Sequence, residues 1–436
     1  MDPFLTGILG ILALFFMLGV GVHIGVALGV VGVLGMLAII GLEAGVSLLA
    51  TTSFHFATNP EFIVMPLFIL MGLLAMIGGI SEATYSALSK WIGKIRGGLG
   101  IATVGACTAF GTVSGSALVT ATVFARVSCP EMRRQGYSKG LAYGIVSSAG
   151  AIGMLIPPSL LAVVYGLLTL ESIGDLLIAG IAPGVLLALV FTVGILVMAY
   201  TNPTLAPPVA FDITWGQRLA SLKDFWPIGI SGVVVIGGIY SGFFTPSEAG
   251  AFGALAILLI AVFWGGMRWP QLRKALNETV SITAMIFLIL IAAKVFSRFM
   301  MLSGVAPKLV NTILDLGLGP LGLVITMAIL YLILGAFLDS ISMLSITIPV
   351  IYPAVQALGI DPMWFAMVVI LAIHVGLITP PVGLNVYAVK GVAEPDVSLE
   401  DIFRGTIPFF FMMLLALAII IAFPTLSTWL PARILH

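Results

Sequence analysis

The stretch that decides the fold is the apolar run of residues 98–125, GLGIATVGACTAFGTVSGSALVTATVFA. Basic residues flank it on both sides: Lys90, Lys94 and Arg96 come before it, and Arg126, Arg133, Arg134 and Lys139 come after it. Because Lys and Arg collect on the cytoplasmic side of a membrane, we expect the chain to enter and leave this run on one side. Two full crossings need about 40 residues. The run therefore predicts a re-entrant hairpin with the polar segment Gly111–Ser116 at its tip.

The composition places this hairpin in a membrane protein. Of the 436 residues, 60% are hydrophobic and only 8% are charged, whereas soluble proteins average about 25% charged residues. Apolar runs long enough to span a bilayer recur near 4–21, 24–41, 62–79, 98–125, 140–170, 178–200, 228–244, 250–266, 279–299, 320–358, 363–390 and 406–424. We therefore predict an all-α polytopic membrane protein.

Several functional classes are disfavoured by the sequence. The net charge of zero suggests no nucleic-acid partner. The sequence contains no CxxC, HExxH, Walker or dinucleotide-binding motif. We therefore expect neither an enzyme nor ATP-driven transport by this chain alone, and no cofactor other than a coupling ion.

The run that follows the hairpin, 140–170, is expected to be a broken span. It starts beside Lys139 and ends beside Glu171, so it crosses outward. Its middle carries Gly150–Gly153 and Pro157-Pro158-Ser159. Two prolines remove two backbone donors and disfavour helix at the preceding residue, which predicts a break inside the membrane.

The second half of the chain repeats this order. A second hairpin is predicted over 320–358, with Gly335–Ser340 near its middle, and a second broken span over 363–390, interrupted at Thr379–Asn385. No Lys or Arg occurs between Lys308 and Lys390, so this hairpin is expected to open to the other side. Five crossings per half is an odd number, which predicts two inverted repeats, 1–200 and 228–436, joined by a cytoplasmic linker, 201–227.

Inverted repeats with interrupted helices are typical of secondary transporters, whose ligands bind at the interruptions. In the first half, the hydroxyls of Ser114 and Ser116 and the carbonyls of Gly111, Gly115 and Gly153 offer an oxygen cage for a hard cation such as Na⁺. The alternative is that these small residues only permit close helix packing.

In the second half, Asp339 is the only acid between Asp315 and Asp361. Acids at membrane depth are rare and usually functional, although Asp339 alternatively caps a helix near the surface. Asn385 offers a donor and an acceptor, either to a ligand or to a neighbouring helix.

Four other polar residues stand out. Lys294 and Arg298, four residues apart, either clamp an anion or extend their charges to the interface. His374 is expected to be a packed polar residue, and His23 is expected to lie at an interface.

The blocks Gly111-Thr112-Val113-Ser114-Gly115-Ser116-Ala117, Ile156-Pro157-Pro158-Ser159 and Thr379-Pro380-Pro381-Val382-Gly383-Leu384-Asn385 resemble the large membrane subunit of tripartite ATP-independent periplasmic (TRAP) transporters. Their order and spacing match over nearly the whole chain. The resemblance implies an elevator-type transporter of the bacterial inner membrane that is driven by Na⁺. It also implies a small four-helix membrane subunit and a periplasmic solute-binding protein as partners, and an organic acid such as a C4-dicarboxylate, sialic acid or a keto acid as substrate.

These observations together define the expected site. We expect Na⁺ to bind near Gly111, Ser114, Gly115, Ser116, Gly153, Ser159, Gly335, Asp339, Thr379 and Gly383. We expect the organic anion to contact Ser116, Pro157, Pro158, Ser340, Pro380, Pro381, Asn385 and Arg298. A stand-alone Na⁺/carboxylate symporter that needs no binding protein is the alternative.

Overall fold

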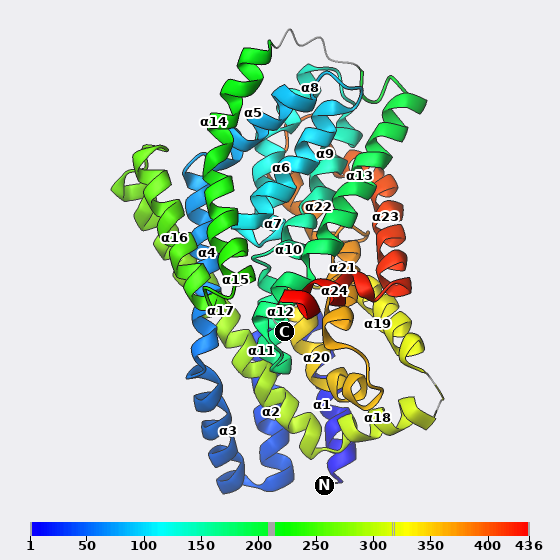
Figure 1. The fold of residues 1–436 in the computed structure, drawn as a ribbon. Helices are drawn as coiled ribbons and strands as arrows, with labels where there is room; N and C mark the ends of the chain where they lie inside the picture. The colour runs from blue at the N-terminus through cyan, green and yellow to red at the C-terminus, as the bar shows by residue number, and fades with distance from the viewer. Residues whose placement is uncertain (1, 208–213, 316, 318, 435–436) are drawn as a thin grey trace.

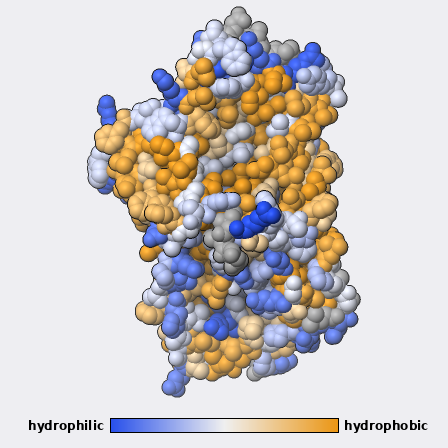
Figure 2. Space-filling model, in the orientation of Figure 1, coloured by the Kyte–Doolittle hydropathy of each residue, from blue (hydrophilic) through white to orange (hydrophobic). Residues whose placement is uncertain are grey.

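The computed structural model describes residues 2–207, 214–315, 317 and 319–434, and its regular elements in these ranges are all helices (Figure 1). Within these described ranges, seven helices are long and apolar enough to cross a membrane, and an eighth crossing is added if one bent pair of helices counts as a single span. Apolar side chains cover the outward faces of α16, α13 and α23 (Figure 2). The protein is thus a multi-pass membrane protein, as its composition predicts.

The first half contains α1 (Pro3–Gly19), α2 (Ile24–Ile40), α3 (Leu42–Ala57), the 3₁₀ helix η1 (Pro60–Ile63), α4 (Val64–Ile77), α5 (Ile80–Ile92), α6 (Gly98–Ser114), α7 (Ala117–Val127), α8 (Cys129–Arg134), α9 (Lys139–Ala149), α10 (Ile152–Leu155), α11 (Leu160–Thr169), α12 (Ile173–Ala179) and α13 (Ile181–Thr201). The second half contains α14 (Trp215–Gly232), the π-helix η2 (Val233–Gly237), α15 (Gly238–Tyr240), α16 (Pro246–Phe263), α17 (Trp269–Leu302), α18 (Val305–Asp315), α19 (Pro320–Gly335), α20 (Ser340–Ala357), α21 (Pro362–Leu377), α22 (Leu384–Lys390), α23 (Leu399–Ala422) and α24 (Thr425–Ile434).

Both predicted hairpins are interrupted where the sequence indicates. α6 and α7 meet at Gly115, whose φ of +60° favours glycine, and Ser116 caps α7 by accepting from the Val119 amide at 3.4 Å. α19 and α20 are separated by residues 336–339. α20 has 18 residues and is long enough to cross a membrane by itself. It is therefore longer than the arm of a hairpin that turns back inside the membrane would need to be.

Both predicted broken spans are also interrupted. The α9–α10 segment and α11 are bent by 44° at the Pro157-Pro158 break. α21 ends at Leu377 and α22 begins only at Leu384, on the far side of Pro380-Pro381. The missing proline amides and the restricted residue before each pair stop these helices.

Helix boundaries differ from the apolar runs in three places. α17 covers 34 residues, starting ten residues before the predicted run 279–299, because Arg273, Lys274 and Glu278 lie on a helical extension that hydropathy alone excludes. α14 starts at Trp215, inside the predicted linker, of which residues 208–213 lie outside the described ranges. α3 was not predicted, since Glu43, His55 and its hydroxyl residues lower its hydropathy.

Glycines let helices from distant parts of the chain pack closely. α2 lies against α17, where a Cβ on Gly32 would come within 2.9 Å of the Phe296 amide nitrogen. α9 lies against α23, where the backbones of Gly144 and Gly405 touch. Such close approach is the usual basis of helix association in membranes, where dispersion replaces the hydrophobic effect.

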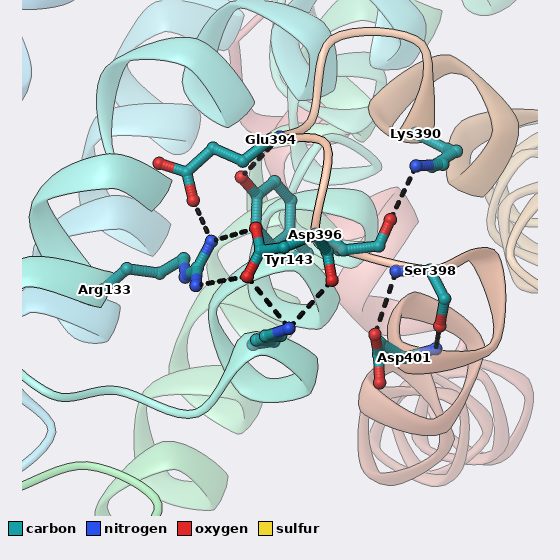
Figure 3. A network of polar contacts seen from close by, with 9 residues as sticks. Arg133, Tyr143, Lys390, Glu394, Asp396, Ser398 and Asp401 are labelled. Carbon is teal, nitrogen blue, oxygen red and sulfur yellow. Dashed lines mark hydrogen bonds and ion pairs between the residues drawn. The ribbon is translucent and has the colours of Figure 1, made fainter.

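A charged network ties α8 and α9 to the loop before α23 (Figure 3). Arg133 donates to both carboxylate oxygens of Asp396 at 2.8 Å and also pairs with Glu394. Lys139 lies 2.9 Å from Asp396, and the Tyr143 hydroxyl accepts from the Glu394 amide at 3.3 Å. Hydrogen bonds from Arg133 and Lys139 hold the pKa of the Asp396 carboxyl well below its usual range. We call this end of the molecule, at the top of Figure 1, the basic end.

Replacing Arg133 with Gln is expected to lower the midpoint of thermal unfolding by a few degrees at pH 7. Because the pKa of Asp396 is depressed in the folded state, the stabilisation is present above about pH 4 and is lost as the pH falls further. The difference between wild type and variant should therefore shrink at pH 3, as measured by tryptophan fluorescence in detergent micelles. Arg134→Gln is the matched control, since Arg134 forms only an exposed pair with Glu131; an equal effect of both variants would contradict the network's role.

Candidate functional site

The interrupted segments meet around one cavity of about 530 Å³, which we call the central cavity. Ser116 at the start of α7 lines it, together with Asp339 and Ser340 at the start of α20. Leu160, the first residue of α11, and Leu384, the first residue of α22, also line it. Segments far apart in the sequence thus bring their helix N-termini to a common place.

A second part of the central cavity's lining, which we call its wall, comes from outside the interrupted helices. It consists of the α1–α2 connection, Gly21–Ile24, and of Ile282, Met285, Ile286 and Ile289 on α17. His23 is the one polar side chain in this part of the described lining, so the other polar side chains of the cavity come from the interrupted helices.

The interruptions are tied to one another in pairs. The Gly115 carbonyl accepts from the Leu160 amide at 3.3 Å, and the Ala336 carbonyl accepts from the Val382 amide at 3.2 Å. Each hydrogen bond joins a hairpin tip to the segment just after a proline pair. It satisfies backbone groups that have no helical partner, as burial in a membrane requires.

Close glycine contacts lie beside these hydrogen bonds. A Cβ on Gly111 would come within 2.6 Å of the Gly153 Cα, and one on Gly335 would come within 2.7 Å of the Gly376 Cα. Gly153 and Gly376 each stand four residues before a proline pair. The two halves therefore use the same device to hold one interrupted pair of helices against another.

Asp339 both caps a helix and lines the cavity. Its Oδ2 accepts from the amides of Ile341 and Ser342 at 3.1 and 3.0 Å, and its Oδ1 accepts from the Ser342 hydroxyl. Among the described residues it has no Lys or Arg partner. The α20 amides and the helix dipole therefore compensate its charge, and its remaining lone pairs are available to a ligand.

The hydroxyls of the first half are buried beside the tip. Ser114 Oγ accepts from Thr120 Oγ1 at 3.3 Å and donates to the Ser116 carbonyl at 3.4 Å. Ser159 caps α11 by accepting from the Ala162 amide at 3.2 Å. These bonds are long or leave lone pairs unused, so the oxygens retain capacity for a further partner.

Asn385, the residue after Leu384, is fully buried. Its Nδ2 donates to the Ser147 carbonyl at 3.3 Å, a contact between the two halves of the chain. Its Oδ1 has no hydrogen-bond partner among the described residues, and neither do the buried hydroxyls of Ser148 and Ser345. An unpaired buried oxygen costs roughly 1–3 kcal/mol, which favours a ligand or water beside it.

The structure thus brings only part of the predicted site together. Ser116, Asp339 and Ser340 share the central cavity. The remaining candidates lie outside its described lining: Gly111, Ser114, Gly115, Gly153, Pro157, Pro158, Ser159, Gly335, Thr379, Pro380, Pro381, Gly383, Asn385 and Arg298. Pro157 and Pro158 are buried, whereas Pro380 and Pro381 are exposed.

Arg298 belongs to a second cavity of about 420 Å³, which we call the outer cavity. His55, near the end of α3, and Lys294, in the second half of α17, also line it. His374 is fully buried and contacts the Met154 sulfur at 2.8 Å, in agreement with a packed polar residue.

His23 is a cavity residue that sequence reasoning missed. Its Nδ1 accepts from the Gly25 amide at 3.3 Å and caps α2, so a neutral ring carries its proton on Nε2. None of the described residues lining the central cavity is Lys or Arg. The Gly21–His23 turn was the available signal, because a polar residue there caps the following helix.

Comparison with solved structures identifies the fold. The Alcanivorax borkumensis YdaH transporter superposes with a TM-score of 0.61 at 16% identity, covering 89% of this chain and 88% of that one. This chain therefore shares the fold of that transporter.

The family follows from sequence comparison. Residues 11–426 match the model described as "Tripartite ATP-independent periplasmic transporter, DctM component", and this chain belongs to that family. The C4-dicarboxylate TRAP transporter large permease protein of Pseudomonas aeruginosa is 34% identical over 81% of this chain and 82% of its own length. The ectoine TRAP transporter large permease protein of Halomonas elongata is 32% identical over 78% and 79%. Both relatives are named as large permease subunits of TRAP transporters, the family that the sequence motifs resemble.

Adding a methyl group between the paired glycines should destabilise the protein. In Gly376→Ala the new Cβ would lie 2.5 Å from the Gly335 Cα, and backbone cannot yield cheaply. We expect the free energy of unfolding to fall by about 1–3 kcal/mol, seen as a lower thermal midpoint in detergent.

Gly229→Ala on α14 is the matched control for this substitution. Its Cβ would meet nothing within 4 Å, so stability should hold or rise by up to about 1 kcal/mol through helix propensity. Equal midpoints for the two variants would contradict the close contact of Gly335 with Gly376.

Proposed function

We propose that this chain is the large transmembrane subunit of a Na⁺-coupled importer of an organic anion, working by an elevator mechanism. The observation that carries the proposal is the composition of the central cavity. Hydroxyls, a carboxylate and helix N-termini face it, while its described lining contains no Lys or Arg. Such a cavity is suited to an anion that arrives together with a cation.

The argument for a cation is electrostatic. A substrate carboxylate close to Asp339 would place two negative charges in a site of low dielectric, which is strongly unfavourable without compensation. Carboxylate, hydroxyl and carbonyl oxygens are the ligands that hard cations prefer. In this proposal Na⁺ binds beside the tips, among Gly111, Ser114, Gly115, Ser116, Gly153 and Ser159 in the first half and Gly335, Asp339, Thr379 and Gly383 in the second.

The argument for an anion rests on the helix ends. α7, α11 and α20 all begin at the central cavity, and helix N-termini attract negative charge through free amides and the helix dipole. The substrates printed in the names of the two relatives, C4-dicarboxylate and ectoine, both carry a carboxylate. In this proposal Ser116 and Ser340 contact the substrate directly. Pro157, Pro158, Pro380, Pro381 and Asn385 shape the breaks behind them.

The elevator proposal rests on the parallel construction of the two halves. The same hydrogen bond and the same glycine contact occur once in residues 1–200 and once in residues 228–436. We interpret these halves as inverted repeats, with 201–227 as the cytoplasmic linker. The interrupted helices would move together past the wall formed by α17 and the α1–α2 connection.

The family's tripartite organisation supports the partners in the proposal. We infer a periplasmic binding protein that delivers the anion, a small four-helix membrane subunit, and a location in the bacterial inner membrane. The second candidate is a stand-alone Na⁺/carboxylate symporter, favoured by the presence of a complete central cavity in this single chain.

Reconstituted uptake tests the proposal and separates the two candidates. Proteoliposomes with an inward Na⁺ gradient should accumulate one member of a panel of organic acids only when the binding protein is added. Uptake by this chain alone would favour the stand-alone symporter. Uptake that needs ATP, or that is indifferent to the Na⁺ gradient, would refute the coupling.

Asp339→Asn should reduce Na⁺-driven uptake by at least about tenfold, mainly through weaker apparent Na⁺ affinity. Asn also caps helices well, so the fold should persist. Asp361→Asn is the matched control, because Asp361 caps α21 through two amides at 2.9 Å but does not line the central cavity. If both variants transport like wild type, Asp339 is only a cap.

A further inference from the structure

The outer cavity gathers cationic and hydrogen-bonding side chains in one place. Lys294 and Arg298 stand four apart on α17 and therefore on neighbouring turns of one face. His55 from α3 and Asn59 from the following turn complete its donors, with the hydroxyls of Thr51 and Thr52 beside them. No acid is present in the described lining of this cavity.

Local contacts hold Lys294 in position without neutralising it. Its Nζ donates to the Leu168 carbonyl at 2.6 Å, near the C-terminal end of α11, and lies 5.4 Å from the centre of the Phe56 ring. A carbonyl and an aromatic face attract the ammonium group but supply no counter-charge. Two of its three N–H donors remain for another partner.

Arg298 and Asn59 also keep unused donors. Arg298 makes no hydrogen bond or ion pair within the described ranges. Asn59 uses its Oδ1 to accept from the Glu61 amide at 2.9 Å, which leaves its amide nitrogen to donate. Snorkelling accounts for one exposed cation at a helix end, but not for a cavity in which two cations and an amide converge.

The outer cavity is next to the central one along two helices. α11 begins at the central cavity with Leu160, and Leu170, directly after its end, lines the outer cavity. Ten helical residues span about 15 Å. On α17, Ile289 lines the central cavity and Lys294 lines the outer one. Figure 1 places this part of the molecule, with α3 and α18, away from the basic end.

We propose that the outer cavity is a second, staging site that binds the carboxylate of the transported acid before it reaches the central cavity. This inference rests on the proposed function. The volume of about 420 Å³ suits a small organic acid. Lys294, Arg298 and Asn59 bind the carboxylate, and the positive potential raises the local concentration of anions.

Charge-selective labelling tests the site without requiring transport. Ser297 lines the outer cavity, and the native cysteines, Cys107 and Cys129, are both buried. The measured quantity is the labelling rate with an anionic methanethiosulfonate divided by the rate with its cationic analogue. This ratio should be about tenfold higher in Ser297→Cys than in Asn311→Cys on α18. Adding Lys294→Gln and Arg298→Gln should abolish this preference, and succinate or acetate should slow labelling.

Three labelling outcomes would overturn the proposal. One is equal reactivity toward both reagents. Another is a preference that survives the double Gln substitution. The third is a preference for the anionic reagent without any slowing of labelling by succinate or acetate, which would leave two snorkelling cations. In that third case, slowing by glycerol phosphate alone would assign the cavity to a phospholipid headgroup.

Uptake kinetics supply the second arm. In the double variant Lys294→Gln, Arg298→Gln, the KM for the transported acid should be about tenfold higher than in wild type, with kcat retained. The charge-conserving double variant Lys294→Arg, Arg298→Lys should have the wild-type KM. An unchanged KM with Na⁺-driven uptake intact would overturn the staging site and leave the proposed function standing. Labelling selectivity with carboxylate protection, but no Na⁺-driven uptake, would refute the proposed function and leave the anion site.

Discussion

The constraint on which this structure depends is that backbone amides and carbonyls must find partners where water is absent. The chain breaks its helices at residues 115–116, 156–159, 336–339 and 378–383, and each break exposes such groups. The breaks satisfy one another in pairs, through Gly115 with Leu160 and Ala336 with Val382. The glycine contacts permit this pairing, because only residues without a Cβ allow the backbones to come so close.

Pairing the breaks has an electrostatic consequence. It collects helix N-termini around the central cavity, where their dipoles favour negative charge. Asp339 already occupies one of these ends, so the cavity both attracts an anion and contains one. In the proposed function, a mobile cation would resolve this conflict and would make binding of the two ligands interdependent. At the basic end, Arg133 and Lys139 hold the loop after α22 by ordinary ion pairing.

Much of the fold could be predicted from the sequence, because its decisive signals are local. Proline pairs and glycine-rich tips indicated the positions of all four breaks, and all four are confirmed. Signals that depend on tertiary contact could not be predicted. His23 joins Asp339 only because the α1–α2 connection folds against the hairpin tips, and Arg298 lies apart from Ser116 because α17 is long enough to reach a second cavity. α3 was missed because hydropathy undervalues a helix that carries hydroxyls.

The central claim is that the paired breaks form one site in which Na⁺ and an organic anion bind together. Equilibrium binding to the purified protein tests it most directly, with the affinity for the transported acid measured at increasing Na⁺ and the affinity for Na⁺ measured at increasing acid. Linkage requires the two affinities to rise by the same factor, which we expect to lie in the range of about 5 to 150-fold. Binding of the acid that is unchanged between Na⁺ and a large inert cation such as choline would contradict the claim.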